Sequence, residues 1–195
     1  MKIVGLTGSF GTGKTFVASI FSSLGAKVID ADKLAKGCLK KGTAVYREVV
    51  KEFGDSILSA EGSIDRKRLA AEVFSNDVRR AALEKIVHLA IIRSIMDGIA
   101  KAKLSDVVVI DAPLLVEAGL GEIVDIMVVV KSSHKKQIER CMKKFGMDKR
   151  DVESRIACQI PLNNKILMAD FVIDNDGTMS ETRKQTRKVW RQIWK

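Results

Sequence analysis

A glycine-rich segment near the start of the chain has the residue spacing that most directly predicts chemistry. Residues 8–15, GSFGTGKT, fit the pattern G-x-x-x-x-G-K-[ST] of a phosphate-binding loop. In such a loop, backbone N–H groups at a helix N-terminus surround phosphate oxygens, the lysine reaches the β- and γ-phosphates, and the hydroxyl can hold Mg²⁺. The predicted nucleotide-phosphate site consists of Gly8, Ser9, Phe10, Gly11, Thr12, Gly13, Lys14 and Thr15.

Carboxylates follow two further apolar runs and are candidates for acid–base and metal chemistry. Asp32 comes soon after the second run, where it could accept the proton of an alcohol, with Asp30 in support. The alternative is that one of the two simply caps the next helix. Asp111 ends the run 107–110, where a carboxylate could bind Mg²⁺ through water, although it could equally be a turn residue before Pro113.

Two other positions are candidates for substrate contacts, each with a structural alternative. Leu114 and Leu115 followed by Glu117 are typical of a pocket wall with a polar end, or of an ordinary helix start. His88 lies in an apolar stretch and is either a core or interface histidine or a substrate contact.

The segment from Lys131 to Arg150 is strongly basic, with eight Lys or Arg residues against two acids. A charge run of this kind is usually a solvated face, but next to a phosphate loop it can form a lid that closes over the phosphates and excludes water. We therefore predict a basic lid. Helical spacing places four of its cations on one face: Lys136, Arg140, Lys143 and Lys144.

Short apolar runs alternating with helical patterns predict the elements that position these groups. Such alternation favours an α/β fold, with a five-stranded parallel sheet flanked by helices, in which ligands bind at the carboxyl ends of the strands. The candidate chemical residues follow strands and are thus expected at one edge. The predicted strands are 3–6, 27–29, 107–110, 126–130 and 171–173.

Helical patterns account for the rest of the chain. They run from about 34 to 53 and from about 66 to 103, and the second is broken near Ser75–Asp77, where Asn76 or Asp77 could cap a new helix. A closing amphipathic helix is expected from about 180 to 194. Its apolar side favours packing on the sheet over a nucleic-acid site.

The composition is that of an ordinary globular protein with an excess of positive charge. The formal charge of +10 over 195 residues fits nucleic acid, an acidic membrane surface or a polyanionic small substrate. Three widely spaced cysteines without C-x-x-C favour neither a disulfide framework nor a zinc site. The first apolar run leads directly into the phosphate loop and acidic residues interrupt the long apolar runs, so we expect a cytoplasmic protein without a membrane anchor.

Three classes of protein use such a loop: small-molecule kinases, GTPase-type switches and ATP-driven nucleic-acid proteins. The guanine motif N-K-x-D is absent, and the D-x-x-G at 174–177 follows the last predicted strand rather than an early one. Aromatic residues make up only 5% of the chain and are sparse in the basic segment, which disfavours nucleic-acid binding. The kinase interpretation remains, with no nucleic-acid partner expected.

Five motifs, taken in order, make the chain resemble the dephospho-coenzyme A kinase family over nearly its whole length. The resemblance extends to 64–88, which is similar to the helical coenzyme A subdomain of that family. The motifs are GLTGSFGTGKT at 5–15, VIDAD at 28–32, PLLVE at 113–117, RIA at 155–157 with Gln159, and ADFVIDN at 169–175 with Gly177.

The resemblance implies a fold and a reaction. The fold is a single P-loop kinase domain, 1–195, with a helical substrate subdomain at about 34–103 and a basic lid at about 132–165. The reaction is phosphorylation of the ribose 3′-hydroxyl of dephospho-coenzyme A by ATP with Mg²⁺, the last step of coenzyme A synthesis. ATP and dephospho-coenzyme A are then the partners, and no obligate protein partner is implied.

The resemblance also assigns roles to individual residues. It implies that Asp32 is the general base, that Arg140 is a lid arginine acting with Lys14, and that Asn175 lies near the adenine. Thr15 and Asp111, the latter through water, are the metal candidates. The substrate-side residues are Asp32, His88, Leu114, Leu115 and Glu117.

Two positions depart from the family pattern. His88 is followed by Leu89 where family members often have proline, which leaves the local backbone there open. Lys144 stands where a second lid arginine is common, so it keeps the charge without bidentate phosphate geometry. A nucleotide kinase of the same fold is the alternative function.

Overall fold

The computed structural model describes residues 1–74, 76–104 and 106–194, and its internal contacts divide the chain into two units. The first unit comprises Met1–Asp30 and Lys101–Lys195, and the second comprises Ala31–Ala100. The second overlaps the predicted subregion 34–103. Whether it serves the substrate stays a prediction, and each unit is considered by itself below.

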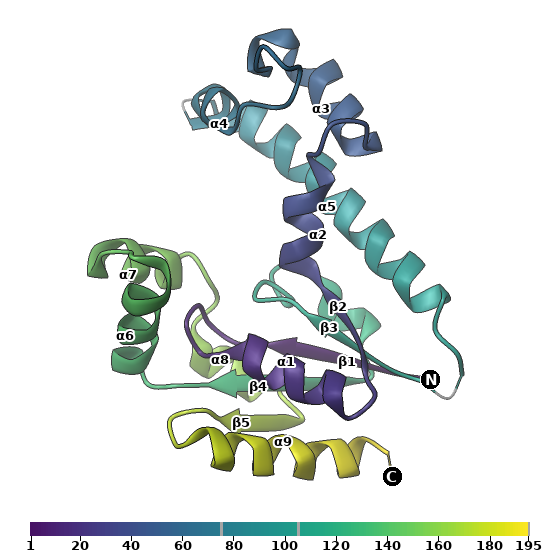
Figure 1. Cartoon of the computed structure of the whole chain (residues 1–195), viewed down its shortest axis with the longest axis vertical. Coiled ribbons are helices and arrows are strands. Elements are labelled where there is room, and N and C mark those ends of the chain that lie inside the picture. Colours follow the sequence, from purple (N-terminus) through teal and green to yellow (C-terminus); the bar gives the residue numbers. More distant parts are fainter. Residues whose placement is uncertain (75, 105, 195) are drawn as a thin grey trace. The chain divides into compact units, whose positions relative to one another are not determined.

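The first unit is built on a parallel sheet (Figure 1). Its strand order is β2-β3-β1-β4-β5, and every neighbouring pair is parallel. All the predicted strands are therefore confirmed, each with its end moved by one residue at most. They are β1 (Lys2–Thr7), β2 (Lys27–Asp30), β3 (Val107–Asp111), β4 (Ile126–Lys131) and β5 (Phe171–Asp174).

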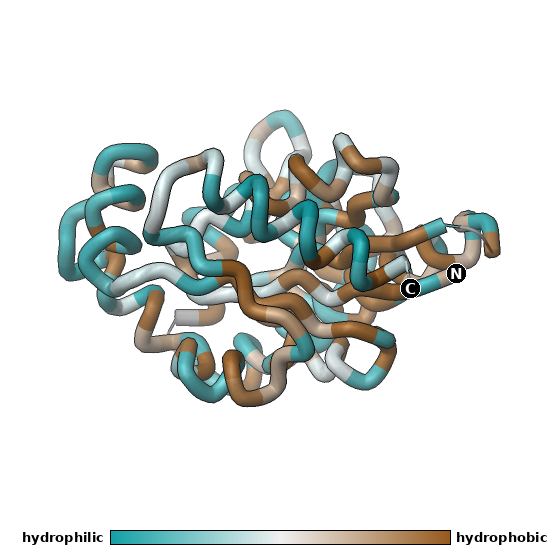
Figure 2. The backbone as a smooth tube through the Cα atoms, turned by 90° about the horizontal axis from the view of Figure 1, so that it is seen from below, coloured by the Kyte–Doolittle hydropathy of each residue, from teal (hydrophilic) through white to brown (hydrophobic). Residues whose placement is uncertain are grey.

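The central strands are rich in β-branched residues because helices or loops cover both of their faces. Every residue of β3 is buried, as are the four middle residues of β4. Most of the sheet is correspondingly brown in the hydropathy view (Figure 2).

Two helices from opposite ends of the chain pack together on this sheet, α1 (Lys14–Ser23) and α9 (Met179–Ile193). Phe21 is fully buried between them, 6.1 Å from Trp190 between ring centroids. The predicted closing helix is thus confirmed within one residue at each end, and its apolar side packs on the sheet. A capping box fixes its start, where Thr178 and Glu181 satisfy each other's backbone N–H groups.

The basic segment folds into helices that belong to the first unit. They are α6 (His134–Phe145) and α7 (Lys149–Ala157), followed by the short α8 (Leu162–Leu167). Ile138, Cys141 and Val152 form a small core between α6 and α7, and Phe10 of the phosphate loop packs against it. In Figure 2 these two helices lie at the left and are largely teal, as their charge requires.

The second unit is helical, with its own core around Val49, Phe53 and Ile57. The predicted periodic segment 34–53 is two helices rather than one, because Gly42 has a φ of +90° and Thr43 then caps the second helix at Tyr46 N. The elements are α2 (Ala31–Cys38), α3 (Ala44–Phe53), η1 (Asp55–Ile57), α4 (Arg66–Phe74) and α5 (Asp77–Ala100).

The predicted break before α5 is confirmed. The side chain of Asn76 accepts a hydrogen bond from Arg79 N at 3.1 Å, so Asn76 rather than Asp77 is the capping residue. Ser75, the first residue of the predicted break, lies outside the described residues.

None of the helices that the structure describes has both the length and the apolar character needed to span a bilayer.

Candidate active site

The phosphate loop joins the carboxyl end of β1 to the first turn of α1, the strand–loop–helix context that the motif requires. None of its three glycines can carry a side chain: at Gly8, with a φ of +151°, a Cβ would lie 2.4 Å from Val130 O. Gly11 has a φ of +82°, and a Cβ there would lie 2.7 Å from Gln137 O of α6. Gly13 caps α1 with a φ of +88°, and a Cβ there would overlap the Asn175 amide. The loop is therefore enclosed by protein on its outer side.

Buried polar side chains hold the loop in place through hydrogen bonds to its backbone carbonyls. Thr12 is fully buried, and its hydroxyl donates to Ser9 O at 2.9 Å. Asn175, which follows β5 and is 6% exposed, donates from Nδ2 to Thr12 O at 2.7 Å. Its Oδ1 accepts from Thr182 Oγ1 at 2.8 Å, so both ends of the amide are committed to this structure. Asn175 thus supports the loop directly; its predicted position near adenine stays a prediction.

Arg140 of α6 reaches the same place. Its guanidinium donates to Asn175 O at 2.6 Å, to Ser132 Oγ at 3.1 Å and to Thr12 O at 3.3 Å. The structure therefore brings the predicted lid arginine to the phosphate loop, where it binds two backbone carbonyls. Its role toward a phosphate stays a prediction.

Gln159, which follows α7, also attaches the basic helices to the phosphate loop. Gln159 Oε1 accepts from Phe10 N at 2.8 Å and from Ser9 Oγ at 3.1 Å. The Phe10 ring stacks on the Phe145 ring, with 5.8 Å between the ring centroids. The Arg155 guanidinium lies over the same Phe10 ring, 5.5 Å from its centroid. These contacts join the basic helices to the phosphate loop; closure over bound phosphates stays a prediction.

Other cations of the basic segment have different neighbours. Lys136 Nζ donates to Asp176 O, and Lys144 Nζ lies 5.1 Å from the Phe145 ring centroid.

Cys141 of α6 lies against Gly11 of the phosphate loop. Burial raises the pKa of its thiol, so this side chain is a neutral packing group.

Lys14 and Asp111 meet at the carboxyl edge of the sheet. Lys14 Nζ lies 3.6 Å from Asp111 Oδ1, and Asp111 is 7% exposed. Strand register places Asp111 beside both Leu6 and Asp30. The opposite charge of Lys14 offsets part of the cost of burying this carboxylate next to a second one.

The metal candidates fit a magnesium ion that keeps most of its ligands from phosphate and water. Thr15 is exposed in the first turn of α1, and Asp111 is a carboxylate on the same sheet edge. Within the described part of the chain, no group of three or more His, Cys, Asp or Glu side chains could hold a metal. Thr15 and Asp111 offer the one or two protein oxygens that Mg²⁺ in a nucleotide site uses together with substrate phosphates.

The segment after β3 has one exposed and one buried leucine. Leu114 is 49% exposed, whereas Leu115 is fully buried, and its methyl groups lie 3.0 Å from where a Cβ on Gly5 would stand. Leu115 therefore supports the segment from beneath. The carbonyl of Pro113 accepts from Thr7 Oγ1 at 3.2 Å, which ties the segment to the end of β1.

A buried lysine that the sequence analysis missed holds this segment in place. Lys165 of α8 is fully buried, and its Nζ lies 2.7 Å from Glu117 Oε1 and 2.7 Å from Pro113 O. Glu117 Oε1 also accepts from Ile160 N at 2.9 Å. Glu117 is thus the partner of a buried cation. No sequence signal marks Lys165, because its partners come from a segment about 50 positions away.

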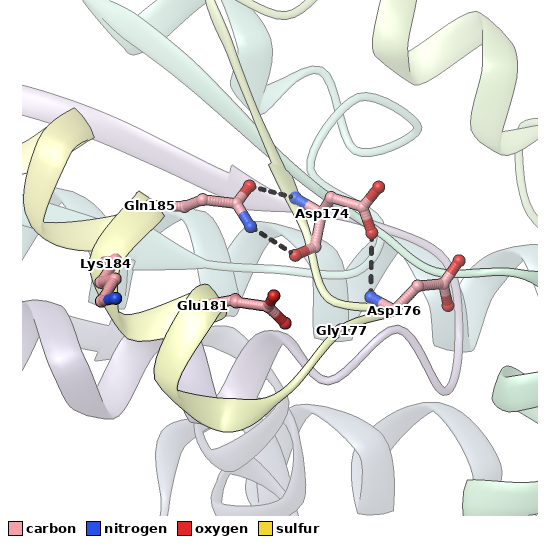
Figure 3. Close-up of a pocket in the computed structure, with 6 residues that line it drawn as sticks. All are labelled: Asp174, Asp176, Gly177, Glu181, Lys184 and Gln185. Carbon is pink, nitrogen blue, oxygen red and sulfur yellow. Dashed lines mark hydrogen bonds between the residues drawn. The ribbon is translucent and has the colours of Figure 1, made fainter.

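The turn after β5 is shaped by its own side chains (Figure 3). The Gln185 amide brackets Asp174, accepting from its N and donating to its O, each at 2.9 Å, and Asp174 Oδ1 accepts from Asp176 N at 2.9 Å. Asp176 in turn accepts from Ser133 N at 2.8 Å, at the start of α6. Its pKa is lowered, first by that backbone N–H and then by the Ser132 and Ser133 hydroxyls. The turn therefore fixes Asn175 and Arg140 relative to each other.

The second unit carries the remaining predicted residues. Asp32 is exposed in the first turn of α2. His88 is exposed on α5, where it lines a shallow hollow of about 350 Å³ with Glu84, Lys85 and Leu89 among its neighbours. A core position for His88 is therefore excluded, because the side chain is exposed, whereas the interface and substrate-contact alternatives both stay predictions.

A parallel sheet in this order, with a phosphate loop at its carboxyl edge and cationic helices packed on that loop, defines a P-loop kinase. The chain belongs to the dephospho-CoA kinase family, whose model, described as CoaE, dephospho-CoA kinase, matches residues 2–181. This family catalyses the final step of coenzyme A biosynthesis, the ATP-dependent phosphorylation of dephospho-CoA. The kinase interpretation of the sequence is confirmed over the switch and nucleic-acid alternatives.

Individual relatives support the same family over most of their lengths. A dephospho-CoA kinase from Aquifex aeolicus is 45% identical over 186 residues, which is 95% of this chain and 94% of that protein. One from Syntrophotalea carbinolica is 40% identical over 188 residues, covering 95% and 89%.

Solved structures agree on the fold. TT1252 from Thermus thermophilus is similar with a TM-score of 0.87 and 28% identity, covering 100% of this chain and 98% of that one. Dephospho-CoA kinase from Campylobacter jejuni gives 0.67 and 27%, covering 98% and 97%. Shikimate kinase from Acinetobacter baumannii gives 0.54 at 14% identity, covering 100% and 93%, a likeness of fold alone.

Proposed function

We propose that this chain transfers the γ-phosphoryl group of Mg-ATP to the ribose 3′-hydroxyl of dephospho-CoA, with residues 8–15 as the donor site and Asp32 as general base. The observation that carries the donor half is the phosphate loop itself. Asn175 and Arg140 both donate hydrogen bonds to Thr12 O of this loop, so its N–H groups are preorganised before phosphate arrives.

The donor chemistry follows from preorganisation and charge. The N–H groups at the start of α1 bind the β- and γ-phosphate oxygens, and Lys14 offsets the charge that develops on them during transfer. Lys14 already lies at the sheet edge, beside Asp111, and phosphate oxygens would compete with that carboxylate for its ammonium group. Arg140, bound to the loop carbonyl of Thr12 and to the carbonyl of Asn175, acts by positioning the loop and by its positive charge nearby.

The acceptor chemistry is assigned to Asp32. It lies two residues past the carboxyl end of β2, whose last residue, Asp30, is in register with Asp111. Its exposed carboxylate accepts the proton of the 3′-hydroxyl as the new O3′–P bond forms and the bond from phosphorus to the ADP oxygen breaks. The position in the first turn of α2 also stabilises the carboxylate, because the helix dipole favours negative charge there.

Magnesium is part of this proposal. Thr15, whose side chain is exposed, would contribute its hydroxyl directly. Asp111, which is buried, would bind the ion through water. When bound with ATP, Mg²⁺ supplies charge neutralisation of the β- and γ-phosphate oxygens.

The remaining assignments complete the proposal. Leu114 and His88, which are exposed, are proposed to contact the acceptor. Leu115 and Glu117 are proposed to support the wall of the acceptor pocket through their buried contacts with Gly5 and Lys165. We also propose a cytoplasmic location without nucleic-acid, membrane or obligate protein partners. Free thiols at Cys38, Cys141 and Cys158 support a reducing compartment.

An acceptor panel tests the proposed function. Purified protein and Mg-ATP are incubated with dephospho-CoA, with nucleoside monophosphates and with simple alcohols, and the product is identified by mass and by phosphorus NMR. We expect phosphate on the 3′-oxygen of dephospho-CoA. Turnover confined to a nucleoside monophosphate would instead favour the nucleotide kinase alternative.

A further inference from the structure

The second unit contains a surface hollow surrounded by positive charge. It has a volume of about 260 Å³ and lies between the end of α2 and the start of α4. Four of its lining side chains are cationic, and the others are small or apolar: Lys36, Lys40, Lys41 and Arg66, with Leu39, Ser63 and Ile64. We call this feature the cationic hollow.

The walls of the cationic hollow are held in place by the fold of the second unit. Lys41 Nζ donates to Glu61 O at 2.7 Å, and Tyr46 Oη donates to Gly62 O at 2.6 Å, so the loop that carries Ser63 is fixed against α3. Leu39 and Ile64 pack on the core of the unit. The cations therefore surround a defined space and are not scattered over an open surface.

The positive charge of the cationic hollow is not neutralised within the described residues. Other cations of the second unit pair with carboxylates there, such as Arg68 with Asp65 at 3.7 Å and Arg80 with Asp77 at 2.7 Å. In the described residues, none of the four cations of the hollow lies within salt-bridge distance of a carboxylate. Like charges gathered around one space repel one another, so an anion bound there would be favourable.

Helix α2 links the cationic hollow to the proposed general base. Lys36 is four residues after Asp32, so the two side chains share one face of α2, with Lys36 about 6 Å further along the axis. Both are exposed, whereas Cys38 of the same helix packs on the core. Lys40 follows two residues after the end of α2 and lines the same hollow.

We propose that the cationic hollow binds the diphosphate of dephospho-CoA. The inference rests on the proposed function, because it takes Asp32 as the group beside the 3′-hydroxyl. In this substrate the 5′-diphosphate hangs from the same ribose as the 3′-hydroxyl, so the two groups must bind within one sugar's reach of each other. A base in the first turn of α2 and cations from the second turn onward match that order.

This assignment gives the hollow a role in choosing the acceptor. A diphosphate bridging two organic groups carries two negative charges, and lysines bind such oxygens as mobile point charges. An acceptor with the same ribose but no diphosphate, such as adenosine, would not use the site. The hollow therefore contributes to affinity for dephospho-CoA rather than to the transfer step.

The test compares two double variants that lose the same charge. Lys36→Met with Lys40→Met removes two cations of the hollow, and Arg47→Met with Lys51→Met removes two exposed cations at the same spacing on α3. We expect the first to raise the KM for dephospho-CoA about ten- to a hundredfold. Its KM for ATP and its kcat at saturating acceptor should stay near wild type, and the control variant should match wild type throughout.

Two further measurements separate the possible results. Inorganic pyrophosphate should inhibit competitively against dephospho-CoA, and this inhibition should weaken in the Lys36→Met/Lys40→Met variant; competition against ATP alone would place the anion on the phosphate loop and overturn the proposal. Turnover of adenosine should be equal in all three proteins. A wild-type protein inactive on dephospho-CoA refutes the proposed function, whereas an unchanged KM in the double variant refutes only the hollow.

Discussion

The phosphate loop of the first unit and helix α2 of the second carry their functional groups in different ways. The loop offers backbone N–H groups, and buried side chains such as Thr12 and Asn175 hold its conformation. Helix α2 offers exposed side chains, Asp32 and Lys36, on a regular backbone. A substitution near the loop thus acts through geometry, whereas one on α2 removes a single charge or proton acceptor and leaves its support intact.

The phosphate loop and helix α2 also differ in what is needed to hold their functional groups in place. The loop needs glycines that approach Gln137 and Asn175 too closely for a side chain, and its neighbouring segment needs a fully buried lysine. Burying such groups is favourable only when each finds its partner. On α2 the side chains of Asp32 and Lys36 are exposed, so in the described part of the chain no packing or hydrogen bonding holds them as precisely as the loop is held. We expect donor binding to tolerate fewer changes than acceptor binding.

The largest effect is expected for Lys14→Ala. Removing the ammonium group that is proposed to reach the phosphates should lower kcat by about a thousandfold, because the charge that develops on the transferring group would lose its stabilisation. Steady-state kinetics with dephospho-CoA measure the effect, and thermal unfolding checks that the fold persists. Turnover close to wild type would show that the loop's backbone suffices and would weaken the contrast between the units.

A second large effect is expected for Asp32→Asn. Loss of the proton acceptor should lower kcat by about a hundredfold or more, with the KM for ATP unchanged. Asp97→Asn, an exposed change on α5 of the same unit, provides the matched control and should leave kinetics unaltered. If Asp32→Asn changed only the affinity for ATP, a metal or structural role would replace that of general base.

The buried pair in the first unit predicts a change in stability. Lys165→Met should lower the free energy of unfolding by about 3 kcal/mol, since it removes the cation that pairs with Glu117 and one hydrogen bond to Pro113 O, which keeps the bond from Thr7 Oγ1. Chemical denaturation measures this loss. Adding Glu117→Gln to the same protein should recover part of it, and strict additivity of the two changes would show that the pair is not coupled.

The smallest effect is a pH dependence at the turn after β5. Because hydrogen bonds from Ser133 and Ser132 lower the pKa of Asp176 in the folded state, its stabilising contribution is present above the ordinary aspartate pKa. It disappears as the pH falls through the lowered value. Asp176→Asn should therefore be less stable than wild type near neutral pH, with the difference shrinking in acid. A constant difference from pH 7 to pH 2 would contradict the assignment.

Local patterns predicted most of the fold. Runs such as 107–110 and 126–130 are continuous, β-branched and bounded by turn residues, so they are recognisable without their neighbours. The phosphate loop is equally local, since strand, glycines, lysine and helix are consecutive. The split between α2 and α3 was missed because the apolar spacing continues across Gly42 and Thr43, where backbone conformation decides.

In the candidate site, too, local features were predicted from the sequence and long-range contacts were not. Sequence alone predicted the phosphate site, because the groups proposed to bind phosphate are backbone N–H groups of one continuous segment. Only the tertiary structure decided that Asn175 holds Thr12, that Lys165 pairs with Glu117, and that four cations surround one hollow. Those contacts join residues up to 163 positions apart. Hydrogen bonds and ion pairs depend on where folded segments meet, and spacing along the chain carries no record of that.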